Sequence, residues 1–296
     1  MKNNKISLFL DSGGFSAWSK KIEIDIYKYI KFIKEHEQYI DVYAVLDDIL
    51  DPEKTLKNQK IMEKEGLHPL PCFHFGEDLK YLEYYLDNYN YVALGGMVPI
   101  SSKDLSEWLD NLFKNFICDK SGIPKVKIHG FGLTSLRLMF RYPWYSVDST
   151  SWVMTSRMGG VYIPQYKSGE WIYDENSWKI SVSTKSPDKS EAGKHIDTLS
   201  KQQREHIFTY FAEKGYILGK SEFRFESEKY KLKKDEKWGG EAISGKREVE
   251  TILEAGLCND YKMRDELNII YYLDLEKSMP KWPWAFKAKG IERFEL

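Results

Sequence analysis

Short apolar runs alternate along the first half of the chain with segments in which apolar residues recur at helical spacing. The runs predict strands and the segments between them predict helices. The predicted strands cover 6–11, 41–47, 69–75, 91–95, 125–130 and 144–148. The predicted helices cover 25–38, 53–65, 78–88, 102–117 and 133–141. Repeated strand–helix alternation indicates a parallel sheet with right-handed crossovers.

These units fit either an open doubly wound sheet or most of a (β/α)₈ barrel. The sequence disfavours a dinucleotide-binding fold, because Gly13 and Gly14 are adjacent and no Gly-x-Gly-x-x-Gly motif follows the first strand. Polar residues or glycines instead end every predicted strand: Asp11, Asp47, His74, Gly95-Gly96, His129 and Asp148. Such a ring is typical of barrels. We therefore predict an α/β fold with a TIM-like (β/α)₈ barrel, for which a permuted or irregular form is also open, and which 161–166 and 178–184 complete.

A polar, turn-rich segment near residue 184 marks the predicted domain boundary. Beyond it the chain is more charged, with helical patterns at 191–214, 246–256 and 261–277 and a lysine-rich span at 229–237. We expect residues 1–184 to form the barrel domain and 185–296 to form a charged, mainly helical accessory region packed on it.

Composition narrows the class of protein. The chain has 296 residues, 42% hydrophobic and 30% charged, which is typical of a globular protein. The net charge of −1 shows no bulk basicity, although a local basic groove for nucleic acid is compatible with it. Aromatic residues reach 15%, which suits base stacking as well as ordinary packing.

Cysteine usage and hydropathy predict a cytoplasmic protein. Cys72, Cys118 and Cys258 are widely spaced and form no Cys-x-x-Cys pair, which argues against a disulfide framework and a thiolate zinc site. The apolar run after the first residues is too short for a signal peptide. No stretch approaches the ~20 apolar residues that span a bilayer, so we expect no membrane association.

Asp11 and Asp148 are the strongest candidates for chemistry. Each ends a short apolar run and enters a turn, and barrels place their chemistry at the carboxyl ends of strands. Two carboxylates there suggest a nucleophile and an acid/base. The alternative for Asp11-Ser12-Gly13-Gly14 is a tight strand–helix turn capped by the aspartate.

Other strand ends offer groups that could contact a planar base. Only one of Asp47 and Asp48 can face a pocket, and the alternative role for the pair is helix capping. His74 and His129 are either functional or structural histidines, and with Asp11, Asp47 and Asp148 they could instead form the metal site of a barrel hydrolase. Gly95-Gly96-Met97 could offer backbone amides and an apolar lid, or simply form a turn.

Basic and aromatic residues near the last strand ends are candidates for nucleic-acid contacts. Lys127, Arg137 and Arg141 could hold phosphates, unless each is an ordinary surface charge. Trp144 and Trp152 could stack on a nucleotide.

Together these elements resemble the tRNA-guanine transglycosylase superfamily, most closely its phage-type, DpdA-like 7-deazaguanine DNA transglycosylases. Asp11-Ser12-Gly13-Gly14-Phe15 is similar to the signature around the family's acid/base aspartate. Further similar elements follow in the family's order: Asp47-Asp48 with Pro52, Phe73-His74-Phe75-Gly76, Leu94-Gly95-Gly96-Met97, His129-Gly130-Phe131-Gly132 and Val147-Asp148-Ser149. The resemblance covers about residues 6–155.

The chain departs from the tRNA enzymes of this family in two ways. In those enzymes two barrel strands precede the signature, so we expect 161–184 to supply the missing strands in this chain. They also carry a Cys/Cys/Cys/His zinc site after the nucleophile, whereas 149–184 contains no cysteine or histidine. We therefore expect no zinc and no other cofactor, and DNA rather than tRNA as the partner.

The resemblance implies base exchange. Asp148 would attack C1′ of a guanosine nucleotide, and Asp11 would move the proton for the leaving guanine and the incoming 7-deazaguanine. Ser12, Gly13, Asp47, His74, Gly95, Gly96, Met97 and His129 would hold the base. The alternatives are the same reaction on tRNA, a catalytically silent nucleic-acid-binding relative and a metal-dependent barrel hydrolase.

Overall fold

The structure is a computed structural model that describes residues 7–133 and 135–286. Two compact units share these residues, and each is described by itself. The first unit contains 7–149 together with 280–286, and the second contains 150–279.

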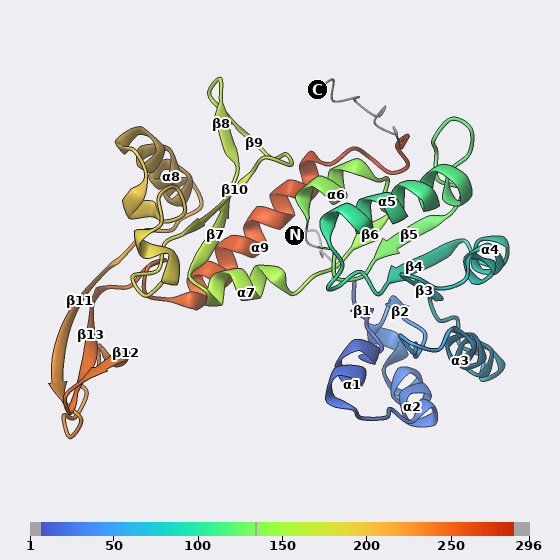
Figure 1. Cartoon of the computed structure of the whole chain (residues 1–296), viewed down its shortest axis with the longest axis horizontal. Coiled ribbons are helices and arrows are strands. Elements are labelled where there is room, and N and C mark those ends of the chain that lie inside the picture. Colours follow the sequence, from blue (N-terminus) through green and yellow to red (C-terminus); the bar gives the residue numbers. More distant parts are fainter. Residues whose placement is uncertain (1–6, 134, 287–296) are drawn as a thin grey trace. The chain divides into compact units, whose positions relative to one another are not determined.

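The first unit is an α/β fold built on parallel strands (Figure 1). Its strands are β1 (Phe9–Leu10), β2 (Val42–Tyr43), β3 (Cys72–His74), β4 (Tyr91–Gly95), β5 (Lys127–Gly130) and β6 (Ser146–Val147). β1 pairs with β2, and β3 to β6 form a parallel sheet in that order. A parallel bridge between Ala44 and Leu70 continues the order from β2 to β3. All six strands lie where the apolar runs predicted them.

This succession of strands curves. The Phe9 ring of β1 stacks on the His129 ring of β5, with centroids 4.5 Å apart, and meets Phe131 edge-on at 5.8 Å. Three strands separate β1 from β5 in the pairing order. The concave face therefore brings the first and fifth strands together.

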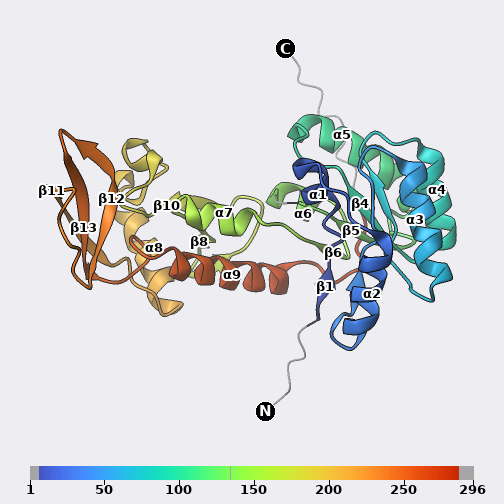
Figure 2. The same ribbon diagram turned by 90° about the horizontal axis from the view of Figure 1, so that it is seen from below.

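Helices follow the strands of this unit: α1 (Gly14–Lys20), α2 (Ile26–His36), α3 (Pro52–Lys64), α4 (Leu79–Asn88), α5 (Ser102–Leu112) and α6 (Leu136–Arg141). A 3₁₀ turn (Glu37–Tyr39) follows α2, and a π-helical turn (Phe113–Ile117) extends α5. Asp51 and Ser101 cap α3 and α5 as predicted, accepting hydrogen bonds from Lys54 N–H and Asp104 N–H. α3 and α4 lie side by side in both views (Figure 2).

The apolar faces of these helices bury the strands. Ile33 of α2 and Met62 of α3 are fully buried with Val45, Cys72 and Ala93 in one core cluster. The chain returns to this unit after residue 279, where the Phe286 ring stacks on Tyr142 at 5.4 Å. Helix–strand burial thus fixes the strand ends that carry the candidate residues.

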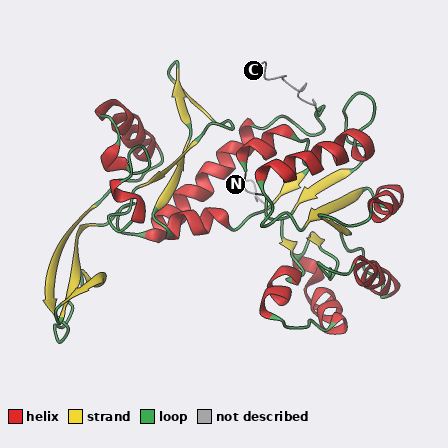
Figure 3. Ribbon diagram, viewed as in Figure 1, coloured by secondary structure: helices red, strands yellow, loops and turns green. Residues whose placement is uncertain are grey.

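The second unit combines helices with antiparallel strands (Figure 3). Its helices are α7 (Ser151–Arg157), α8 (Lys201–Glu213) and α9 (Tyr261–Ser278), with 3₁₀ turns at Pro187–Ser190 and Ile196–Thr198. Its strands are β7 (Gly160–Ile163), β8 (Gln165–Lys167), β9 (Glu170–Ile172), β10 (Trp178–Ser181), β11 (Lys220–Ser227), β12 (Glu236–Ile243) and β13 (Lys246–Glu254). β13 is the central strand of a three-stranded sheet.

Three expectations for this unit need correction. Segments 161–166 and 178–184 do not extend the parallel strands, because β7 and β10 pair antiparallel with each other. Their Val161 and Ile180 share a core with Ile207 of α8 and Leu267 of α9, so the compact unit begins at 150 rather than 185. The predicted helix at 246–256 is β13, and the unit is not mainly helical. The helix predicted at 261–277 is confirmed as α9.

No helix among the described residues combines the length and the apolar character needed to cross a membrane.

Candidate active site at the strand ends

The loop after β1 places two side chains through a tight turn. Gly13 adopts φ of +77°, in the left-handed region where glycine is favoured. A Cβ on Gly14 would lie 2.7 Å from Asp47 Oδ1, so only glycine lets this carboxylate approach the turn. Gly14 N–H donates to Ser12 Oγ at 3.0 Å, while the exposed Asp11 accepts a long bond of 3.4 Å from Gly13 N–H. The turn therefore buries Ser12 and leaves Asp11 facing outward.

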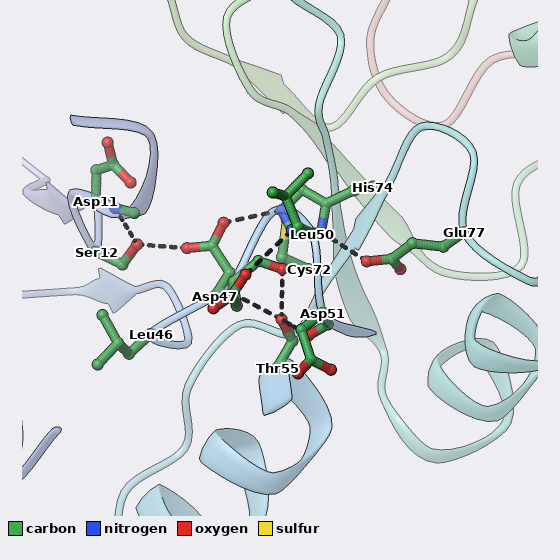
Figure 4. Close-up of polar contacts among 12 residues, drawn as sticks. Asp11, Ser12, Leu46, Asp47, Leu50, Asp51, Thr55, Cys72, His74 and Glu77 are labelled. Carbon is green, nitrogen blue, oxygen red and sulfur yellow. Dashed lines mark hydrogen bonds and ion pairs between the residues drawn. The ribbon is translucent and has the colours of Figure 1, made fainter. Parts of the chain in front are cut away.

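Asp47 is the centre of a hydrogen-bond network (Figure 4). Its Oδ1 accepts from Ser12 Oγ at 2.5 Å, and its Oδ2 lies 2.9 Å from His74 Nε2. Asp48 turns the other way and pairs with Lys54 at 3.0 Å. The two carboxylates therefore have different partners, although both residues line the cavity described below.

His74 is clamped between two carboxylates. Its Nδ1 lies 2.9 Å from Glu77 Oε1, and its side chain is 2% exposed. Burial alone would lower the pKa of His74, but the neighbouring Cys72 and the hydrogen bonds to Asp47 and Glu77 raise it well above the usual range. The ring is therefore an imidazolium that donates to both carboxylates.

A donor set that could hold a metal ion surrounds the same ring. Ligand atoms of Asp47, Cys72 and His74 lie within 4.8 Å of one another, and Cys72 Sγ is 3.5 Å from His74 Nε2. Glu77 on the other ring nitrogen is the partner that metal-bound histidines usually have. Burial raises the pKa of Cys72 to about 11, so without a metal it is a thiol at neutral pH. The donor set suits Zn²⁺.

Gly95 and Gly96 make room for this cluster. A Cβ on Gly95 would lie 2.9 Å from both Cys72 Sγ and His74 Cδ2. Gly96 has φ of +67°, and its Cβ would meet Phe75 N at 3.1 Å. Met97 is buried next to them. The glycine pair thus serves the packing of His74 as well as the turn.

Asp148 directly follows β6, and only one of its carboxylate oxygens accepts a hydrogen bond given for the described residues. Its Oδ1 accepts from Gly132 N–H at 2.8 Å, and its side chain is 48% exposed. His129 Nε2 lies 3.7 Å from the same oxygen and has no hydrogen-bond partner among the described residues. The carboxylate is therefore accessible, with a buried imidazole behind it.

Two hydroxyl groups, from Tyr91 of β4 and Ser146 of β6, form a chain of hydrogen bonds that ends at His129. Its Nδ1 lies 2.7 Å from Ser146 Oγ, which lies 2.6 Å from the Tyr91 hydroxyl. Burial between Phe9 and Phe131 lowers the pKa of His129 to about 3, so the ring is neutral. This row of groups fixes the imidazole beside Asp148.

The charge of Asp11 acts on Asp148 although 137 positions (148 minus 11) separate them in the chain. Partial burial raises the pKa of Asp148, and the charge of Asp11 raises it further. Partial burial also raises the pKa of Asp11, and the charge of Asp47 raises that pKa further. The two carboxylates that the sequence singled out thus both follow strands of the parallel succession, close enough for the charge of Asp11 to act on Asp148.

A cavity of about 530 Å³ opens on the Gly14 and Asp47 side of these groups. Trp18, Tyr27 and Lys54 contribute to its lining, but neither Asp11 nor Asp148 does. Its volume is within the usual range of small-molecule sites, about 300–1,000 Å³.

The predicted nucleic-acid contacts that belong to the first unit do not gather at this site. Trp144 is 4% exposed, with its indole N–H bonded to Leu138 O, so its prediction as a stacking residue is wrong. Arg141 is held by Asp110 at 2.5 and 2.9 Å, and Lys127 begins β5 at the end opposite His129 and lies over the Tyr145 ring. Arg137 is exposed on α6, and Trp152 belongs to the second unit.

Four residues of the site were not predicted from the sequence: Cys72, Glu77, Ser146 and Tyr91. Cys72 is two residues before His74 on the same strand, and this spacing places both side chains on one face. Glu77 comes three residues after His74, across the turn that ends β3. These spacings were available signals, whereas the Tyr91–Ser146 contact joins strands 55 residues apart.

Comparison of the chain with protein-family models, curated proteins and solved structures finds no match.

Proposed function

We propose that this protein is a DNA-guanine transglycosylase, built on a barrel-like succession of six parallel strands, that exchanges guanine in DNA for a 7-deazaguanine base. The observation that carries the proposal is the pairing of Asp11 and Asp148. These exposed carboxylates end the first and sixth of six successive parallel strands, and the charge of one raises the pKa of the other. The resemblance to the transglycosylase superfamily supplies the reaction.

Asp148 suits the role of nucleophile. Gly132 N–H holds its Oδ1 at 2.8 Å, and this bond favours the ionised form. The other oxygen is then free to form a bond to C1′ of the deoxyribose as the C1′–N9 bond to guanine breaks. His129 is a positioning residue that limits the orientation of the carboxylate from behind.

Asp11 suits the role of acid and base. Its hydrogen bond from Gly13 is long, and partial burial and the charge of Asp47 favour its protonated form. It would donate its proton to the departing guanine and then take the N9 proton of the incoming 7-deazaguanine. One glycosidic bond is broken and one is formed, so the exchange needs no redox cofactor or ATP.

The base would lie against Ser12, Gly13, Asp47, His74 and the Gly95-Gly96-Met97 turn. Asp47 already accepts from Ser12 and His74, but each carboxylate oxygen has a second lone pair for an N–H of the base. Glu77 and His74 would act as positioning residues that hold this carboxylate still. DNA is the proposed polymer because 149–184 lacks the cysteine and histidine ligands of the tRNA enzymes.

The test is incorporation of a labelled 7-deazaguanine into duplex DNA and, in a parallel reaction, into tRNA. We expect label in DNA and none in tRNA. Asp148→Ala should abolish incorporation, whereas Asp87→Ala, an exposed aspartate on α4, should leave it unchanged. Full activity of Asp148→Ala would refute the mechanism, and label in tRNA alone would reassign the polymer.

A metal-dependent hydrolase is the second candidate, and the Asp47–Cys72–His74 donor set favours it. Elemental analysis and the absorption of the Co²⁺-loaded protein test this alternative, since a thiolate ligand gives a charge-transfer band. The band should be lost in Cys72→Ser and kept in Cys118→Ser, which replaces another buried cysteine. Absence of bound metal and of the band would eliminate this candidate.

A further inference from the structure

The second unit contains a basic cavity that the proposed base exchange does not use. Its volume is about 420 Å³. Its charged and hydroxyl-bearing lining comes from four parts of the unit: Arg157 of α7, Ser183, Thr184 and Lys185 after β10, Lys237 and Glu250 of β12 and β13, and Tyr261 and Arg264 of α9.

Positive charge dominates the lining, which holds four cationic side chains and one carboxylate. Glu250, 1% exposed, is shared by Lys185 at 2.7 Å and Lys237 at 3.5 Å. Arg157 is exposed and makes no ion pair with any described residue. One carboxylate therefore faces a surplus of cations.

Arg264 is a buried cation that forms no ion pair within 4 Å among the described residues, although Asp260, Asp265 and Glu250 act on it at longer range. It is 5% exposed and donates from Nε to Ser156 O at 2.7 Å and from Nη1 to Leu257 O at 2.5 Å. Asp265 instead accepts from the Ser156 hydroxyl, and Asp260 caps α9. An arginine stays protonated, and burying its charge without a counter-ion is costly unless an anion completes the site.

A hydroxyl without a partner lies in the same wall. Thr184 Oγ1 is buried and has no hydrogen-bond partner among the described residues, although the Thr184 backbone N–H donates to Cys258 O at 3.3 Å. A buried hydroxyl of this kind is unusual in a folded protein. It adds a donor next to the cations.

We propose that this cavity binds a phosphate group carried by an ester, with Arg157, Lys185, Lys237 and Arg264 as its charged ligands. Guanidinium groups match phosphate oxygens with paired N–H donors, and ammonium groups add compact charge. The cavity is open enough for an ester substituent to leave it, because Arg157 and parts of Lys185 and Lys237 are exposed. The proposal stands independently of the transglycosylase function.

Arg157→Gln is the principal test variant, since Arg157 neutralises no described carboxylate and its loss does not strand Glu250. Lys229→Gln removes an exposed lysine that does not line the cavity and is the matched control. Two probes are titrated: pyrophosphate, and a short duplex DNA over a series of salt concentrations. Thermal unfolding of each variant confirms that it is folded.

We expect Arg157→Gln to weaken the bound probe about tenfold, as expected for a lost charge-assisted bond. If the phosphate belongs to a DNA backbone, the slope of log K against log salt falls by about 0.9 as well. If it belongs to a small ester, pyrophosphate binding weakens and DNA binding does not. The inference is overturned if neither probe distinguishes Arg157→Gln from Lys229→Gln.

The result of this binding test does not depend on whether the protein catalyses base exchange. Asp148→Ala should bind the phosphate probe as the parent protein does, even though it exchanges no base. A protein without exchange activity that still shows the Arg157 effect would refute the proposed function and leave the phosphate site standing.

Discussion

His74 and His129 both lie near the carboxyl ends of strands of the same parallel sheet, and both are 2% exposed, yet their surroundings are opposite. His74 lies between the carboxylates of Asp47 and Glu77, which hold it as an imidazolium. His129 lies between two phenylalanine rings and bonds only to the Ser146 hydroxyl, which leaves it neutral.

The contrast shows that the neighbours, and not burial or position in the strand, decide what a strand-end histidine does. The region around His74 is a closed ionic cluster that fixes Asp47. The region around His129 leaves one ring nitrogen facing Asp148 without a hydrogen bond. His74, as a cation, therefore stabilises the Asp47 carboxylate. His129, as a neutral ring, restricts the position of the Asp148 carboxylate without neutralising its charge.

Removing the imidazolium should have the largest effect on stability. His74→Ala leaves two carboxylates without their shared cation in a buried cluster, and we expect a loss of about 3–5 kcal/mol in the free energy of unfolding. His68→Ala, which removes an exposed histidine, should cost little. Urea unfolding measures both, and equal losses would contradict the ionic cluster.

Lowering the pH should remove the contribution of His129 to the stability of the fold but not the contribution of His74. The pKa of His129 falls from 6.5 to about 3 in the folded protein, so its contribution is complete above pH 6.5 and is lost as the pH falls towards 3. The pKa of His74 is raised, so its contribution persists below pH 6.5.

His129→Phe should therefore remove up to about 1.4 kcal/mol per pH unit from the slope of stability against pH in this window. Urea unfolding at several pH values measures the slope. Parallel curves for the parent protein and the variant would show that His129 is not held neutral.

Crowding the His74 cluster should have a smaller effect. Gly95→Ala places a methyl group 2.9 Å from Cys72 Sγ and His74 Cδ2, and overpacking of this kind costs about 1–3 kcal/mol. Gly240→Ala is the control, because no described atom lies within 4 Å of its Cβ position. If both variants unfold at the same urea concentration, the packing of Cys72 and His74 against Gly95 is less tight than these distances indicate.

The smallest expected effect concerns Asp11. Its pKa is raised above the ordinary 3.8, so the folded protein loses stability as the pH rises from 3.8 to the raised value, and the loss is complete above it. Asp11→Asn should raise Tm at pH 8 and leave it unchanged at pH 3, where the parent carboxyl is protonated in both states. Asp87→Asn should change Tm at neither pH, and a lower Tm for Asp11→Asn at pH 8 would contradict the pKa assignment.

The sequence correctly predicted the elements that depend mainly on interactions between residues near each other in the chain. The run 91–95 became β4 with its predicted bounds, and Asp51 caps α3 through its own side chain. The sequence also predicted that Asp11 and Asp148 would lie at the same edge, since the carboxyl ends of parallel strands meet there.

Elements fixed by distant partners were not predictable in this way. Val249 and Ile252 have helical spacing, but β13 lies between β11 and β12, whose pairing overrides local preference. Trp144 is aromatic and near a strand end, but packing against Phe113 buries it. The charge state of His74 depends on Asp47, which is 27 residues away in the chain.

The central claim is that Asp148 forms a bond to the sugar during base exchange. Its most direct test is to incubate the protein with guanine-containing duplex DNA, denature it, digest both polymers and locate the deoxyribosyl adduct by peptide mass spectrometry. We predict an adduct on the peptide that contains Asp148 and its release when 7-deazaguanine is added before denaturation. An adduct on another residue, or base exchange in Asp148→Ala, would contradict it.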